Sequence, residues 1–333
     1  MPTERQVTCP ECEGSVSRRE FVRSVGAVAA GAAGMRLMSP PPAVAAPTPS
    51  SPAETMVKAF YDSLNEEQRK IICMPFDHSR RKRINANWQI TKATIGELFS
   101  KKQQGMIDQI FRGVTSPDGY ERFQKQMKED AGGFDEYTVA IFGKPGSGKF
   151  EWEMTGRHLT IRADGNSVEN TAFGGPIIYG HGTGDGKAGL PGNVFFYQTQ
   201  RANEVFNALD GKQRKKALLT KAPRETDVPI QGRSGTFPGL AVGELSDDQK
   251  GLVEEVIKVI LAPYREADVD EAMGMLKAAG GLDELRMAFY NGDKNDVGND
   301  QVWDVWRIEG PTFVSHFRGA PHVHAYLNVG VKA

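Results

Sequence analysis

The chain has 333 residues, of which 39% are hydrophobic, 25% charged and 9% aromatic, values typical of a folded globular protein. The formal net charge of −1 gives no basic excess, which argues against a nucleic-acid-binding protein. No apolar run reaches the roughly 20 residues that a transmembrane helix needs, so the sequence predicts no membrane span in the mature form.

The first 45 residues have the features of an export signal. Ser17-Arg18-Arg19-Glu20-Phe21-Val22 follows the twin-arginine pattern, an Ala- and Gly-rich apolar stretch comes next, and Ala43-Val44-Ala45 offers the small residues that a signal peptidase accepts. We therefore expect residues 1–45 to be a twin-arginine signal peptide, with Arg18, Arg19 and Phe21 as its recognition residues. The export machinery would be a partner, and the mature protein would lie in the periplasm or outside the cell. A short Ala-rich helix after a chance arginine pair is the alternative.

The remaining chain is expected to form one domain. Residues 46–53 are rich in Pro, Ser and Ala, which predicts a flexible lead-in, and residues 54–333 then form a single α+β domain. Cys9 and Cys12 form a Cys-x-x-Cys pair, half a zinc site or a redox pair, but both lie in the segment expected to be removed. Cys73 then stands alone, so the mature protein has no internal disulfide.

One short pattern occurs three times and predicts helix starts. Leu64-Asn65, Leu209-Asp210 and Leu245-Ser246 are each followed by a Gln three residues after the polar residue, which is the capping-box arrangement. The uneven spacing argues against a solenoid, and three well-capped helices are a sufficient explanation. The third helix is the clearest, because apolar residues recur at helical spacing from Leu252 to Leu261 and Ala262-Pro263 ends it. Residues 268–290 also have a helical pattern, broken by Gly280-Gly281.

Two regions have the composition of strands. Residues 137–142 and 150–161 flank a glycine-rich turn and predict a hairpin. Residues 302–308, 312–317 and 322–329 predict three more short strands, whereas residues 173–193 hold eight glycines and predict a long loop. Strand pairs alternate with clusters of helices, so we expect an α+β fold. Its antiparallel sheet would be built from hairpins near 137–163 and 302–329, with flanking helix clusters.

The hairpin turn matches the sequence pattern of a nucleotide-binding loop but lacks the other features that such a loop needs. Gly143 to Lys149 fits the pattern GxxxxGK, but Phe150 stands where a Ser or Thr must hold magnesium. A β-like run follows where a helix must begin. We therefore expect no nucleotide cofactor.

The histidines are the best functional lead. On a strand, His322 and His324 share one face with Tyr326 and Asn328, and the apolar residues between them share the other. Two imidazoles placed in this way can share a transition metal such as zinc, copper or iron, and His158 and His181 are candidates for further ligands. A half-exposed strand with polar residues outward is the alternative. His316 joins the pair only if the turn register allows it. Arg157 is expected to point away from His158, to the opposite strand face.

Several motifs of this chain, taken in their order along the sequence, resemble those of the family called domain of unknown function 3500. They are Gly156-Arg157-His158-Leu159-Thr160, Phe173-Gly174-Gly175-Pro176, Tyr197-Gln198, the Leu209-Asp210 helix start, Trp306 to Pro311 and His322-Val323-His324. The resemblance spans roughly residues 55–329. It implies a fold grouping and no particular reaction.

Two functions remain open at this stage. The first is an exported metal-dependent enzyme, a hydrolase or an oxidoreductase, with His158, His322 and His324 as ligands and His181 as a fourth ligand or a general base on a mobile loop. The second is a non-catalytic binding protein of the cell envelope, with a groove formed by the Trp303/Trp306 strand and the glycine loop. In either case the partner would be an unidentified small molecule.

Overall fold

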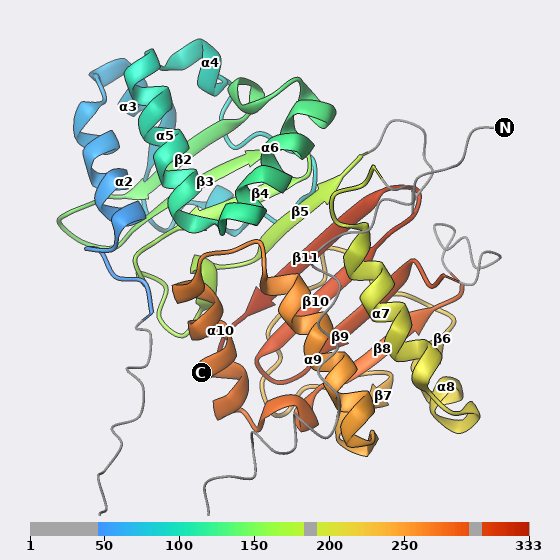
Figure 1. Ribbon diagram of the computed structural model, residues 1–333. Coiled ribbons are helices and arrows are strands. Elements are labelled where there is room, and N and C mark those ends of the chain that lie inside the picture. Colours follow the sequence, from blue (N-terminus) through green and yellow to red (C-terminus); the bar gives the residue numbers. More distant parts are fainter. Residues whose placement is uncertain (1–45, 183–191, 293–301, 333) are drawn as a thin grey trace, which may run out of the picture. The chain divides into compact units, whose positions relative to one another are not determined.

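The computed structural model describes residues 46–182, 192–292 and 302–332 (Figure 1). They belong to one compact unit, Ala43–Ala333, and the expected signal peptide, with Cys9 and Cys12, lies outside the described residues. None of the helices in these ranges has both the length and the apolar character needed to span a bilayer.

One mixed sheet organises the described residues. It has 11 strands in the order β1-β2-β3-β4-β5-β11-β10-β9-β8-β6, with β7 paired to β8. All pairs are antiparallel except β1 with β2 and β6 with β8, at the two ends of this order. The fold is therefore α+β, as predicted.

The elements form two repeats, which we call the first and second repeat. Their order is the same except at one position, where the first repeat has a short helix and the second has a short strand. The first, residues 52–181, contains α2 (Pro52–Ser63), α3 (Glu66–Ile72), β1 (Cys73–Met74), α4 (Ile95–Leu98), α5 (Lys101–Val114), α6 (Pro117–Ala131), β2 (Thr138–Gly143), β3 (Phe150–Gly156), β4 (Leu159–Ala163) and β5 (Ile177–His181). The second, residues 196–329, contains α7 (Phe196–Ala208), α8 (Gly211–Ala217), β6 (Leu218–Leu219), β7 (Leu240–Ala241), α9 (Asp247–Leu261), α10 (Glu266–Ala278), β8 (Arg286–Tyr290), β9 (Val305–Glu309), β10 (Phe313–Arg318) and β11 (Val323–Val329). The last strands of the two repeats, β5 and β11, pair at the centre of the sheet.

Side-chain contacts support this duplication. Gln68 and Gln103, from the capping boxes of α3 and α5, exchange hydrogen bonds of 3.0 and 2.9 Å. Gln213 and Gln249, from the capping boxes of α8 and α9, do the same at 3.1 and 2.9 Å. The three predicted helix starts are thus confirmed. The first two are equivalent positions of the two repeats, and the third is equivalent to Ser100.

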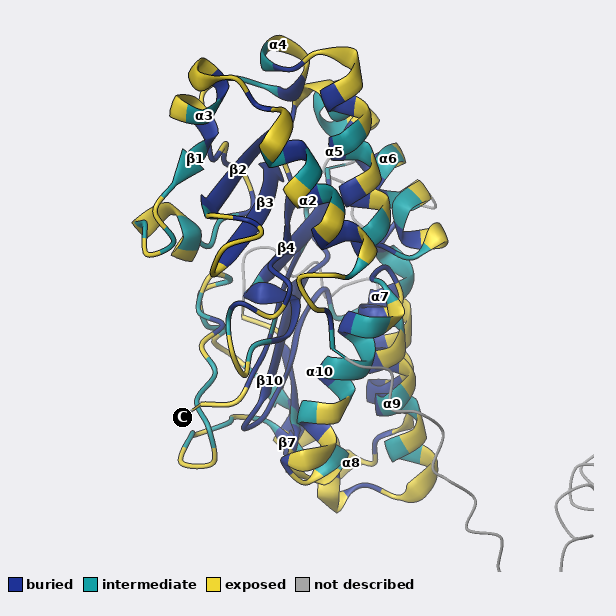
Figure 2. Cartoon of the chain, turned by 90° about the vertical axis from the view of Figure 1, so that its left-hand side faces the viewer, coloured by how far each residue is buried: buried dark blue, intermediate teal, exposed yellow. Residues whose placement is uncertain are grey.

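The two faces of the sheet differ in what covers them. Figure 2 shows the helices gathered on one side and irregular segments on the other. The main hydrophobic core lies on the helical side and takes residues from both repeats, from Ala53 to Val329. On the other side, residues 84–90 and 228–230 pack over the sheet, and Ile178, Val314 and Tyr326 lie beneath them.

Two sequence-based assignments were wrong. Residues 286–290 form strand β8 rather than helix, because Gly280 and Gly281, with φ of 118° and 76°, end the helical region before it. The expected loop 173–193 contains β5, whose Ile177, Ile178 and Tyr179 are buried between glycines. A short apolar run of this kind has no alternating pattern because both of its faces are covered. The hairpin β2–β3 is confirmed, and Phe150 begins its second strand.

Candidate metal centre

His158 lies in the tight turn between β3 and β4. Its φ of 58° falls in the left-handed region, which side chains other than glycine and asparagine seldom adopt. Its N–H donates to the carbonyl of Ala86 at 2.6 Å, and the carbonyl of Arg157 accepts from Tyr137 at 2.7 Å and from Gln126 at 3.0 Å. These bonds fix the turn, and only 2% of His158 is exposed.

His322 and His324 lie where β11 begins. His324 is in β11, opposite Gly180 of β5 and Arg318 of β10. His322 is the residue immediately before the first residue of β11. Their Nε2 atoms are 3.0 Å apart. The expected placement of both rings on one side of the chain is therefore present, although His322 is not itself a strand residue.

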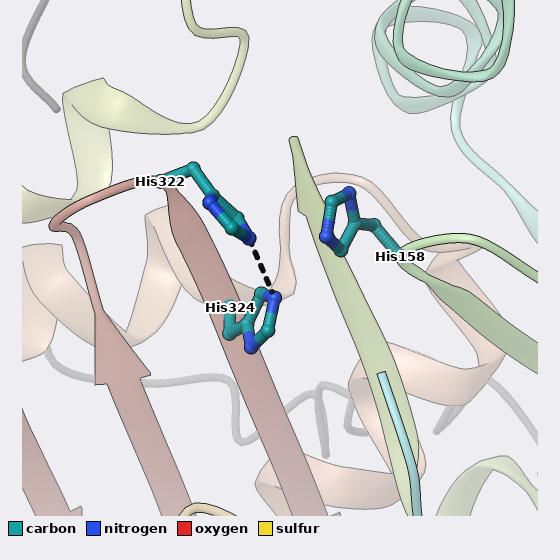
Figure 3. Close-up of side chains that lie close together, drawn as sticks. All are labelled: His158, His322 and His324. Carbon is teal, nitrogen blue, oxygen red and sulfur yellow. Dashed lines mark hydrogen bonds between the residues drawn. The ribbon is translucent and has the colours of Figure 1, made fainter. Parts of the chain in front are cut away.

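The three rings meet at the junction of the two repeats. Figure 3 shows the ring of His158 facing those of His322 and His324. One ligand atom from each lies within 4.8 Å of the others, and the ring centroids are 4.7–4.9 Å apart. Two nitrogens bound at 2.0–2.1 Å to one tetrahedral ion are about 3.3 Å apart. The Nε2 atoms of His322 and His324 are already about this close, and nitrogens 4.8 Å apart would need to approach by about 1.5 Å. This group could hold a metal.

Two carboxylates hold the outer nitrogens of this group. Asp130, at the end of α6, lies 2.7 Å from Nδ1 of His158, and Glu225, in the segment after β6, lies 2.8 Å from Nδ1 of His324. Each bond fixes a ring so that its Nε2 is free to face the centre, as second-shell carboxylates do in known metal sites. Glu225 also pairs with Arg318.

The carboxylates are held in their ionised form. Burial acts to raise the pKa of Asp130, but its hydrogen bonds with His158 and Gln126 and the charge interactions with His158 and His181 together outweigh burial, and the pKa lies below its usual value. Burial opposes ionisation of Glu225 too, yet the hydrogen bond with His324 and the charge of Arg318 lower its pKa to about 2. Both groups are therefore acceptors near neutral pH.

Two of the clustered imidazoles are held in their neutral form. Burial and the neighbouring His324 and His158 lower the pKa of His322 to about 4. Burial is also the main cause of the lowered pKa of His324. A neutral imidazole keeps a nitrogen lone pair, which is what a metal ligand needs.

Comparison with known proteins identifies the family but no reaction. The family model described as "Protein of unknown function (DUF3500)" matches residues 47–327. The chain belongs to this family. No curated protein and no solved structure matches the chain. The resemblance noted from the sequence motifs is thus confirmed, and any assignment of function to this DUF3500 protein depends on its site geometry.

The structure does not bring His181 into the group. It ends β5 and is fully buried, with Nε2 2.8 Å from Glu129 and Nδ1 accepting from the N–H of Val194 at 3.1 Å. Both ring nitrogens are therefore engaged away from the three clustered rings. His181 lies in a strand rather than on a loop, because the expected loop contains β5.

His316 is also separate from the group. In the β10–β11 register it lies opposite Tyr326, not opposite His322. It is buried, and burial with the nearby charge of Arg307 lowers its pKa to about 3.

Arg157 and His158 do not point to opposite sides as strand residues would. A Cβ added at Gly182 would lie 2.9 Å from the His158 ring and 3.3 Å from the Arg157 guanidinium, so both side chains reach the same glycine. The alternation expected from the sequence fails because the two residues form a turn.

The tryptophans of the alternative binding groove belong to the core. Trp306 is fully buried and stacks on Phe317 at 4.8 Å, and Trp303 packs edge-on against Phe206. Residues 183–191 of the glycine loop lie outside the described residues.

Sequence reasoning missed Asp130 and Glu225. They lie 28 and 99 positions from the histidines that they contact, and neither belongs to a recognisable motif. The end of α6 places Asp130 beside the β3–β4 turn, and the irregular segment after β6 places Glu225 beside β11. The pairing of β5 with β11 then brings the two carboxylate–histidine pairs together.

Proposed function

We propose that this DUF3500 protein is a metal-dependent enzyme in which His158, His322 and His324 hold one transition-metal ion. The observation that carries the proposal is the convergence of three imidazoles, two of them fixed through Nδ1 by Asp130 and Glu225. The hydrogen bond between the Nε2 atoms of His322 and His324 accounts for the contact of those two rings. It does not explain why the buried ring of His158 faces them as well, which a shared metal ion would explain.

The donor set favours zinc, copper or iron. Neutral nitrogen ligands suit these ions, whereas calcium and magnesium prefer oxygen. Three protein ligands leave a coordination position for water or substrate, which is the arrangement of catalytic rather than structural zinc sites. Hydrolysis by metal-activated water is the reaction class that we favour, and copper or iron would instead support oxidation and reduction.

Metal analysis is the direct test. The purified protein should contain close to one equivalent of zinc, copper or iron, or bind added zinc with one-to-one stoichiometry in calorimetry. His158→Ala, His322→Ala and His324→Ala should each abolish binding. His181→Gln and His78→Gln are matched controls and should bind as the native protein does. Absence of metal together with absence of zinc binding would end the proposal.

We also propose that the protein is exported through the twin-arginine route. The support is the order of Arg18-Arg19, Phe21, the mild apolar stretch and Ala43-Val44-Ala45. This route carries folded proteins, which suits a metal loaded before export.

Fractionation of cells tests the export proposal. Replacing Arg18 and Arg19 together by Lys should leave the protein in the cytoplasm, because the paired guanidiniums are the recognition element. A matched control replaces Arg23 and Arg36 by Lys and should be exported normally. Normal delivery of the first variant would contradict the twin-arginine proposal.

A further inference from the structure

The duplication gives the metal site a counterpart in the second repeat. His158 lies in the β3–β4 turn, and the equivalent turn between β9 and β10 contains Pro311 and Thr312. An irregular segment hydrogen-bonds to each turn, although the direction of the bond is reversed between the two. Ala86 accepts from the N–H of His158 at 2.6 Å, and Pro311 accepts from the N–H of Gly232 at 3.0 Å.

A pocket occupies this counterpart position. Its accessible volume is about 330 Å³, and its lining includes Met275 and Ala278 near the end of α10, Pro311 and Thr312 of the turn, Arg233, and Lys332 after β11. Each part has an equivalent around His158. The end of α10 corresponds to the end of α6 with Asp130, and the chain after β11 corresponds to Gly182 after β5. The volume is at the lower end of the range for small-molecule sites.

The chemistry of the pocket differs from that of the metal site. Thr312 stands where the first repeat has its ligand histidine, and the lining contains no His, Cys, Asp or Glu, so a transition metal has no donor set here. Met275, Ala278 and Pro311 instead supply apolar walls.

The charged groups of the pocket are cationic. Arg233 and Lys332 are exposed at its edge, and neither makes an ion pair within the described ranges. Its lining has no Asp or Glu. The negative end of the α10 dipole opposes an anion by about 0.3–1 kcal/mol, which two full positive charges outweigh.

Thr312 adds a polar group without a partner. Only 5% of the residue is exposed, and its hydroxyl makes no hydrogen bond in the described part of the chain. Buried hydroxyls are nearly always hydrogen-bonded, so an unbonded one in a pocket wall indicates that a ligand or water supplies the partner.

We infer that this pocket binds a small organic anion with an apolar body and a carboxylate. The body lies against Met275, Ala278 and Pro311, and the carboxylate pairs with Arg233, whose planar guanidinium can donate two parallel hydrogen bonds. Lys332 adds a second positive charge. The site is separate from the metal centre and does not depend on the proposed function.

Calorimetry with the full chain tests the inference. The probes are benzoate and octanoate, the corresponding amides benzamide and octanamide, and inorganic phosphate. Both carboxylates should bind at least 10-fold more tightly than the amides or phosphate. The double variant Arg233→Gln with Lys332→Gln should weaken carboxylate binding at least 10-fold. Ala278→Trp, at an exposed position that fills the pocket, should abolish it.

Two controls separate this site from others. Arg201→Gln removes an exposed arginine that pairs with Glu204 elsewhere and should leave binding unchanged. His322→Ala should also leave it unchanged, because the metal centre is not involved. Failure of both carboxylates to bind at millimolar concentration overturns the inference. Equal binding of amides or phosphate does so as well, as does full binding by Ala278→Trp.

Discussion

At the scale of single residues, the carboxylates behind the histidines are the most informative groups. The shared side of His322 and His324 could be found in the sequence, because a strand pattern places side chains on known faces. His158 was a candidate ligand from the sequence too, but as a strand residue, and it lies in a turn instead. Asp130 and Glu225 could not be found, because they depend on α6 and on a long irregular segment reaching the sheet. The clustered histidines were thus predictable, and the groups that orient them were not.

These orienting groups give the first prediction. Asp130→Asn and Glu225→Gln should each weaken zinc binding about 10–100-fold, the range typical of lost second-shell partners. Calorimetric titration with zinc measures this effect. Glu129→Gln is the matched control, because Glu129 neighbours Asp130 but pairs with His181. Equal zinc affinity in all three variants would show that the carboxylates are only structural.

His316 gives a prediction about acid stability. Its pKa is about 3 in the folded protein, against about 6.5 when unfolded, because of burial and the charge of Arg307. The unfolded chain therefore binds the proton first, and stability falls as the pH drops from 6.5 towards 3. By pH 4 the loss attributable to His316 reaches up to about 3 kcal/mol.

Urea unfolding at several pH values checks this effect. His316→Gln should lose less stability than the native protein between pH 6.5 and pH 4, whereas His78→Gln should follow the native curve. Parallel curves for His316→Gln and the native protein would mean that His316 does not contribute to acid sensitivity.

At the scale of elements, capping boxes were the most reliable signals. Each uses a side chain three residues from the cap, so the evidence is local and survives in the sequence. In the sequence, the duplication is visible only in the nearly equal spacing of equivalent cap residues. Asn65 and Asp210 are 145 positions apart, and Ser100 and Ser246 are 146 apart. Loops of unequal length between the strands hide the rest. Strand β5 was missed for a different reason, since a strand buried on both faces has no alternation.

The paired caps give an element-scale prediction. In a double-mutant cycle, Gln213→Ala and Gln249→Ala should couple by about 1 kcal/mol, because each glutamine loses the same reciprocal hydrogen bonds. Gln68→Ala and Gln103→Ala should couple at least as strongly, since that pair is buried. Denaturant unfolding measures all variants.

The control is a double-mutant cycle that combines one glutamine from each repeat. Gln103→Ala and Gln213→Ala share no hydrogen bond and should be additive within about 0.5 kcal/mol. Coupling of similar size in the crossed pair would show that the effect does not arise from the paired caps.

At the scale of the whole molecule, the two repeats share both a core and a site. The main hydrophobic cluster takes residues from each, and β5–β11 pairing joins their sheets. His158 comes from the first repeat, whereas His322 and His324 come from the second. A metal ion bound by all three would therefore link the repeats.

This linkage predicts one cooperative unfolding transition that metal shifts as a whole. Zinc at 100 times its Kd should stabilise the folded state by about 2.7 kcal/mol, because it binds the assembled site and not the separated segments. Scanning calorimetry with and without zinc measures the shift. His158→Ala, in one repeat, and His324→Ala, in the other, should abolish the shift equally, and His181→Gln should retain it. Two transitions, of which zinc moves only one, would contradict a site built jointly by both repeats. So would a zinc shift that survives the loss of His158, since the remaining pair belongs to the second repeat alone.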